Sequence, residues 1–180
     1  PGGSGKTSLC YCLAGVIPGF YSAGEFQGEV RVGGQAISGL RPAAAARWVG
    51  LMLEKAERQL FHLSLAEDIA FGPENLALPP AQIGETLARL AGQLNLQHLM
   101  ARAPHTLSAG EAQRGALAAT LALDPPVLVL DQPASHLDPG ARPGLYALLQ
   151  ELAMNHGKAI VVTECDARIG EWATWATRVL

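Results

Sequence analysis

The sequence has few charged residues and no excess of positive charge. Charged residues make up 16% of the 180 residues, and the formal net charge is −3 at pH 7. A protein whose main partner is DNA or RNA usually carries a basic patch, because phosphate contacts supply much of its affinity. The composition therefore gives no electrostatic reason to expect a nucleic acid as a partner.

Long hydrophobic runs and a secretion signal are also missing. A helix that crosses a bilayer needs about 18 or more consecutive apolar residues. The apolar segment 116–123 is stopped by Asp124, Pro125 and Pro126, so we expect no membrane span in this chain. The sequence begins without Met, inside a motif, and ends on the strand-like pair 179–180. We therefore expect a piece of a longer protein.

Cysteine is scarce, with Cys10, Cys12 and Cys165 as the three examples. An odd number of cysteines without metal-ligand spacing predicts free thiols in a reducing compartment. Cys10 and Cys12 lie two positions apart in a predicted helix and face different sides of it. We therefore expect neither a zinc site nor a disulfide.

The hydrophobic residues are plentiful, at 49%, and they fall into alternating helix-like and strand-like segments. Ser-x-x-Glu capping boxes open helices at Ser64 and Ser108. The segments predicted as helices are 8–16, 64–71, 80–94, 108–123 and 142–154, and those predicted as strands are 28–32, 48–53, 127–130 and 159–163. This alternation predicts an α/β fold with a mostly parallel sheet and helices on both faces.

The first seven residues, PGGSGKT, fit the end of the phosphate-binding loop G-x-x-x-x-G-K-[ST]. Glycines allow successive backbone N–H groups to surround phosphate oxygens, and the following helix points its positive end at them. Lys6 is expected to reach the β- and γ-phosphates, and the Thr7 hydroxyl to ligate Mg²⁺. The predicted nucleotide-binding residues in this loop are Gly2, Gly3, Ser4, Gly5, Lys6, Thr7 and Ser8.

The apolar run Val127–Leu130 ends in the acid Asp131. A buried strand with a carboxylate at its end is the usual partner of a phosphate-binding loop, and Asp131 is expected to hold Mg²⁺ through water. By itself this pattern fits an ordinary strand equally well. The loop at the start of the chain favours the magnesium site.

A third motif, LSAGEAQ at 107–113, lies about 20 residues before VLVLDQPASHLD. In this order and spacing the motifs resemble the ATP-binding cassette (ABC) family, whose signature reads LSGGQ. Ser108 and Gly110 are kept, whereas Ala109 and Glu111 replace a Gly and a Gln. The segment SHLD, 135–138, resembles the D-loop of the family. Segments 17–34 and 59–79 are similar to the energy-coupling-factor and cobalt-type branch, which powers import of vitamins and metal ions.

The resemblance implies a P-loop NTPase fold, with a RecA-like core at 1–53 and 115–180 and an inserted helical subdomain at 54–114. It also implies a head-to-tail dimer with a second cassette, separate or fused. Each ATP then lies between the loop of one chain and the signature of the other, where Ser108, Gly110 and Asp138 would contact nucleotide. The pair would sit at the cytoplasmic face of the cell membrane and push on a transmembrane subunit through a groove near 54–75.

The sequence departs from the family at three hydrolytic positions. Gln132 stands where the family has a Glu that polarises the attacking water, and an amide accepts no proton at neutral pH. Glu54 stands where the family has a Gln that contacts Mg²⁺ and water. Its negative charge near the γ-phosphate leaves two alternatives, a metal ligand or a group that repels the nucleotide. The switch histidine is replaced by Glu164 or Cys165, depending on the alignment. These changes predict ATP binding with weakened hydrolysis at the chain's own site.

The residues leave four functions open. The first is an importer subunit with a quiet site that completes the site of an active partner cassette. The second is an importer subunit whose own site is active because Gln132 and Glu54 are rearranged. The third is a non-transport ABC ATPase, and the fourth is a non-catalytic module that supports assembly. The sequence does not identify the transported solute.

Overall fold

The computed structural model describes residues 3–21 and 25–165. Its elements are α1 (Lys6–Leu13), α2 (Val16–Gly19), β1 (Arg31–Val32), β2 (Gln35–Ala36), α3 (Pro42–Ala45), β3 (Val49–Met52), η1 (Ala56–Arg58), α4 (Leu65–Asn75), α5 (Pro80–Gln93), η2 (Gln97–Leu99), η3 (Pro104–Thr106), α6 (Ala109–Leu121), β4 (Val127–Asp131), α7 (Arg142–Asn155) and β5 (Ala159–Thr163). The segments 1–2, 22–24 and 166–180, which hold Gly2 and the end of the predicted core, lie outside the described residues.

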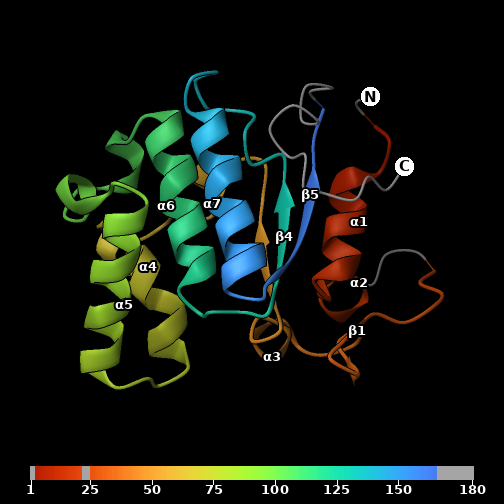
Figure 1. Cartoon of the computed structure of the whole chain (residues 1–180). Coiled ribbons are helices and arrows are strands. Elements are labelled where there is room, and N and C mark those ends of the chain that lie inside the picture. The colour runs from red at the N-terminus through yellow and green to blue at the C-terminus, as the bar shows by residue number, and fades with distance from the viewer. Residues whose placement is uncertain (1–2, 22–24, 166–180) are drawn as a thin grey trace.

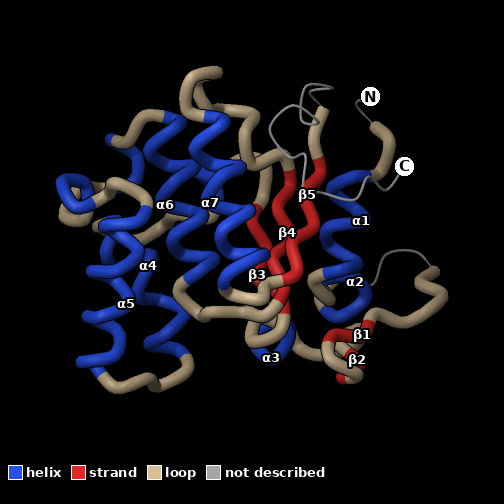
Figure 2. The backbone as a smooth tube through the Cα atoms, viewed as in Figure 1, coloured by secondary structure: helices blue, strands red, loops and turns tan. Residues whose placement is uncertain are grey.

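A parallel sheet in the order β3-β4-β5 forms the centre of the molecule. Val49 pairs with Val127, and Val127 pairs with Ala159, so the three strands are in register. Because the strands are parallel, their carboxyl ends meet at one edge. Figures 1 and 2 show that the beginning of α1 lies at this same edge.

Both faces of the sheet are covered, as the sequence predicted. Leu128 and Leu130 of β4 are buried in the core that α6 and α7 share, whereas Val129 is buried on the opposite face beside Cys10 of α1. Figure 1 shows α1 on one side of the sheet and α6 and α7 on the other. A strand buried on both faces needs a continuous apolar run, which explains the sequence of β4.

The two predicted capping boxes are present. At α4, the Glu67 N–H donates to Ser64 Oγ at 3.3 Å and the Ser64 N–H donates to Glu67 Oε2 at 3.0 Å. At α6, the corresponding bonds between Glu111 and Ser108 are 3.3 and 2.7 Å. Each box pairs two N–H groups that a helix start leaves free. The helix predicted to end at Phe71 continues through Pro73 to Asn75.

Two other elements differ from the predicted ranges. The first helix begins at Lys6 rather than Ser8, and it ends before Gly15, whose φ of 71° is left-handed. The strand predicted over 28–32 is only Arg31–Val32, and it pairs with β2 in a hairpin. Gly33 and Gly34 have φ values of 55° and 84°, and two such residues form the tight turn that joins short antiparallel strands.

The helices α4 and α5 form a layer beside α6, away from α1 (Figure 1). Leu90 of α5 and Ile69 of α4 are fully buried in the same core as Leu128 and Leu149. One apolar core thus includes residues from both sides of the predicted subdomain boundaries at 54 and 114. These boundaries stay a prediction. Among the described residues, no helix has the length and apolar character that crossing a membrane requires.

Candidate nucleotide site

The glycine-rich loop turns sharply before α1. Gly3 and Gly5 have φ values of 77° and 83°, a conformation that side chains with a Cβ rarely adopt. A Cβ on either residue would meet nothing within 4 Å, so the protein leaves space around the loop. The helix begins at Lys6, and the partial positive charge of its N-terminus favours an anion there. The Lys6 ammonium donates a hydrogen bond to Ser4 Oγ at 3.2 Å.

Asp131 joins the loop to the sheet. Thr7 Oγ1 donates to Asp131 Oδ2 at 2.6 Å, and Thr163 Oγ1 donates to Asp131 Oδ1 at 2.5 Å. Asp131 is 1% exposed, and a buried carboxylate requires such partners. The hydroxyl of Thr7 and the carboxylate of Asp131 are hard oxygen donors side by side. This donor set fits Mg²⁺, which prefers oxygen ligands and usually keeps some of its waters.

Cys10 extends this line of contacts into the core. Its thiol donates to Thr163 Oγ1 at 3.9 Å, and its side chain is fully buried. Burial and the negative charge of Asp131 raise the pKa of Cys10 to about 11, because both disfavour the thiolate. Cys10 is therefore a neutral thiol at pH 7 and not a nucleophile. Sequence reasoning did not predict the contact between Cys10 and Thr163. The available signal was Thr163 itself, a polar residue at the end of an apolar strand.

A cavity of about 530 Å³ opens beside the loop. Its lining residues come from the loop, from the first turn of α1 and from the segments that follow three strands, and they are Gly3, Ser4, Gly5, Lys6, Thr7, Ser8, Glu54, Gln132 and Cys165. The structure thus brings two of the predicted catalytic positions, Glu54 and Gln132, to the phosphate loop. Gln132 has a φ of 51°, which is uncommon for a residue other than glycine, and its N–H donates to Thr163 O at 2.9 Å.

The structure does not bring Glu164 to this cavity. Glu164 Oε1 accepts a hydrogen bond from the Ala134 N–H at 3.1 Å and one from the Tyr146 hydroxyl at 2.9 Å. Both partners lie toward α7 and the segment that follows Gln132. Of the two alternatives for the switch position, Cys165 is the one that lines the cavity. The buried Tyr146 was not among the predicted site residues. It lies 18 positions from Glu164 in the chain, so no local sequence pattern indicated their contact.

The predicted signature residues lie at the start of α6. Ser108 precedes α6, Gly110 lies in its first turn, and neither lines the cavity beside the loop. A Cβ on Gly110 would lie 3.6 Å from Leu137 Cδ2, so the signature helix contacts the segment that ends at the exposed Asp138. Hydrogen bonds from the Ser108 backbone and side chain, followed by nearby Arg102 and Arg114, lower the pKa of the Glu111 carboxyl.

A glycine-rich loop before a helix, bonded to an acid at the end of a buried parallel strand, defines a P-loop nucleotide-binding domain. The family model described as ABC transporter matches residues 1–135. The chain therefore belongs to the ABC transporter family, as an ATP-binding domain of the ABC ATPase class.

Relatives among curated proteins agree with this assignment. The chain is 37% identical over 164 residues to a putative ABC transporter ATP-binding protein of Caldanaerobacter subterraneus, covering 91% of this chain and 29% of that protein. It is 34% identical over 179 residues to the energy-coupling factor transporter ATP-binding protein EcfA of Carboxydothermus hydrogenoformans, covering 99% of this chain and 63% of that protein. The chain thus spans less than two thirds of either relative.

Solved structures share the fold. CbiO1 of Clostridium perfringens, described as part of the ABC transporter complex cbiONQ, superposes with a TM-score of 0.77 at 27% identity, over 92% of this chain and 64% of that one. A dimeric ATP-binding cassette in a post-hydrolysis state with ADP and Pi gives a TM-score of 0.81 at 22% identity, over 96% and 75% of the chains. The EcfA and CbiO1 matches confirm the resemblance to the energy-coupling-factor and cobalt-type branch.

Proposed function

We propose that this chain is the ATP-binding part of an importer that moves a small solute, a vitamin or a metal ion, across a membrane. The bond between Thr7 and Asp131 carries the nucleotide part of the proposal, because it places a hydroxyl and a carboxylate together at the phosphate loop. The solute class comes from the similarity to EcfA and CbiO1.

Gly3, Ser4, Gly5, Lys6, Thr7 and Ser8 would surround the phosphates of ATP, with Gly2 added from the sequence motif. Thr7 and Asp131 would hold Mg²⁺, which supplies charge neutralisation at the phosphates when it is bound. Glu54 lines the same cavity and is a further candidate ligand. Ser108, Gly110 and Asp138 would contact the nucleotide of a second cassette, since they lie outside the cavity of their own chain.

Hydrolysis at this chain's own site is proposed to be slow. Gln132 lines the cavity and accepts no proton, and general-base catalysis is typically worth about 10²–10⁴ in rate. Cys165 lines the cavity as well, and a thiol is a weak hydrogen-bond donor where the family has a histidine. The proposed work of this chain is therefore to hold ATP and to complete the active site of its partner cassette.

The proposed contact with a transmembrane subunit uses exposed apolar side chains near η1 and α4. Phe61, Leu63 and Phe71 are 65%, 85% and 42% exposed, and the Phe61 and Phe71 rings meet edge to face with centroids 5.2 Å apart. Neighbouring exposed apolar side chains of this kind are typical of an interaction surface. In this arrangement the chain would be peripheral, at the cytoplasmic face of the membrane.

Steady-state ATPase activity of the full-length protein with its partner cassette tests the proposal. Gln132→Glu is expected to raise turnover, and Ser108→Ala is expected to abolish it. If Gln132→Glu changes nothing and Lys6→Ala removes the activity, the local site is active and the quiet-site proposal is wrong. A purely structural assembly module predicts no dependence of nucleotide binding on Lys6.

A further inference from the structure

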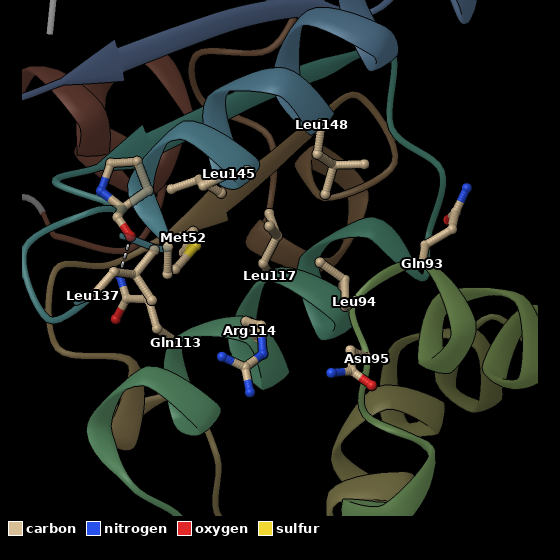
Figure 3. A pocket seen from close by; sticks show the side chains of 13 residues that line it. Met52, Gln93, Leu94, Asn95, Gln113, Arg114, Leu117, Leu137, Leu145 and Leu148 are labelled. Carbon is tan, nitrogen blue, oxygen red and sulfur yellow. Dashed lines mark hydrogen bonds between the residues drawn. The ribbon is translucent and has the colours of Figure 1, made fainter. Parts of the chain in front are cut away.

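A second cavity shares no lining residue with the cavity beside the phosphate loop. It has a volume of about 260 Å³ and lies between the end of α5, α6 and the first turns of α7. Figure 3 shows Leu117 of α6 and Leu145 and Leu148 of α7 on its walls, together with Met52 from the end of β3. The cavity is therefore largely apolar, as ligand pockets usually are.

Two polar side chains of α6 also line this cavity, and each holds a buried atom without a partner. Gln113 is 2% exposed and donates from Nε2 to Pro133 O at 2.9 Å, but its Oε1 has no hydrogen bond. The Nε of Arg114 is likewise buried and unpaired. In the described part of the chain four buried side-chain atoms are unpaired, and two of them belong to residues that line this cavity. Buried polar groups normally have partners, so these atoms require an explanation.

The cavity also contains space that α7 leaves open. Gly144 lies in the first turn of α7, and a Cβ there would meet nothing within 4 Å. A glycine within a helix costs stability relative to alanine, and this exposed glycine lines the cavity. Arg114 is the one charged residue among those that line the cavity. Glu111 lies one turn earlier and already accepts the Ser108 N–H in its capping box, so its carboxylate is engaged outside the cavity.

We propose that this cavity binds a compact amphipathic organic acid. The apolar body would lie among Leu117, Leu145 and Leu148, and the acid group would accept from the terminal nitrogens of the Arg114 guanidinium. Drug-sized ligands occupy pockets of about 300–1,000 Å³, so a cavity of 260 Å³ selects a smaller molecule.

The cavity adjoins segments that carry residues of the nucleotide site. Its walls include Met52, two residues before Glu54, and Pro133, directly after Gln132. They also include Leu137 of the D-loop-like segment, which the signature helix contacts at Gly110. A bound molecule would thus contact elements from both halves of the site that the proposed function assigns. The binding itself does not depend on that function.

Isothermal titration of the full-length protein with indole-3-acetate, without nucleotide, tests the site. The probe has an apolar ring, one N–H donor and one carboxylate. Gly144→Leu fills the open space and is expected to weaken binding at least about tenfold, a change that calorimetry resolves readily. Gly84→Leu is the matched control, because Gly84 is also a helical glycine with open space and lies outside the cavity. It is expected to bind like the wild type.

A second pair of measurements keeps the proposal testable if Gly144→Leu does not fold. Arg114→Met should weaken indole-3-acetate about tenfold while leaving the affinity for indole, which lacks the acid, unchanged. If the wild type does not bind indole-3-acetate, the proposal is wrong. This includes the case in which another segment of the full-length protein fills the cavity. Equal binding by the wild type and a folded Gly144→Leu variant, or by the wild type and Arg114→Met, also overturns it.

Discussion

Thr7 Oγ1 and Asp131 Oδ2 lie 2.6 Å apart although 124 positions separate them in the chain. Thr7 is in the first turn of α1, and Asp131 is the last residue of β4. The bond fixes the phosphate loop against the carboxyl end of the sheet, where ligands of open α/β sheets bind. The other Asp131 oxygen accepts from Thr163 of β5, so one carboxylate joins the loop to two strands.

Asp131→Asn is expected to reduce the Mg²⁺-dependent part of nucleotide affinity by about 10- to 100-fold, the usual effect of losing a residue that orients metal-bound groups. An amide keeps the shape but has no charge to offer the cation. Fluorescent ATP analogue titrations with and without Mg²⁺ measure the change. Asp124→Asn is the control, because Asp124 is exposed and pairs with Lys158 at 2.6 Å, on the opposite end of β4. Equal losses in the two variants would contradict the metal role.

The parts of the fold that local patterns determine were predictable. The two Ser-x-x-Glu boxes and the apolar strand 127–131 depend on residues close in sequence, and each is present. The hairpin β1–β2 was missed because each strand has only two residues, too few for a periodic pattern. Its turn glycines, Gly33 and Gly34, were the available signal.

The site was predictable only where a motif encodes it. The loop and Asp131 follow known spacing, but the bonds from Thr163 to Asp131 and from Cys10 to Thr163 join residues 32 and 153 positions apart. Sequence likewise left Glu164 and Cys165 as alternatives, because an irregular segment after a strand does not fix which side chain turns inward. The Tyr146 hydroxyl decides the direction of Glu164 through tertiary packing.

Cys10 should make stability depend on pH above about pH 9. Its pKa is raised from 9.0 to about 11 in the folded protein, so between these values the unfolded chain releases a proton that the folded chain keeps. The stabilisation is complete below pH 9 and is lost as the pH rises through 11. Urea unfolding from pH 8 to 11 should give a steeper decline for the wild type than for Cys10→Ala. Cys12→Ala should keep the wild-type slope, and equal slopes in all three proteins would contradict the argument.

Tyr146→Phe should destabilise the protein by about 1.5–3 kcal/mol, the typical value of a hydrogen bond to a charged group. Tyr146 is 1% exposed, and its hydroxyl donates to Glu164 Oε1 at 2.9 Å. The mutation removes this hydrogen bond, and the partly buried Glu164 carboxylate keeps the one from the Ala134 N–H. Urea unfolding measures the loss. Tyr11→Phe is the control, since the Tyr11 hydroxyl has no hydrogen bond within the described residues. A loss no larger than that of Tyr11→Phe would mean that Glu164 faces elsewhere.

Cys165 should be protected by bound nucleotide against alkylation. Its side chain is exposed and lines the cavity of the phosphate loop, whereas Cys10 is buried. At an ATP concentration roughly ten times its Kd, with Mg²⁺, about one site in eleven is free, so the rate of N-ethylmaleimide modification at Cys165 should fall about tenfold. Peptide mass spectrometry separates Cys165 from Cys12, which lies outside the cavity and serves as the internal control. Protection that is absent at Cys165, or equal at Cys12, would mean that the position after Glu164 does not face the phosphates.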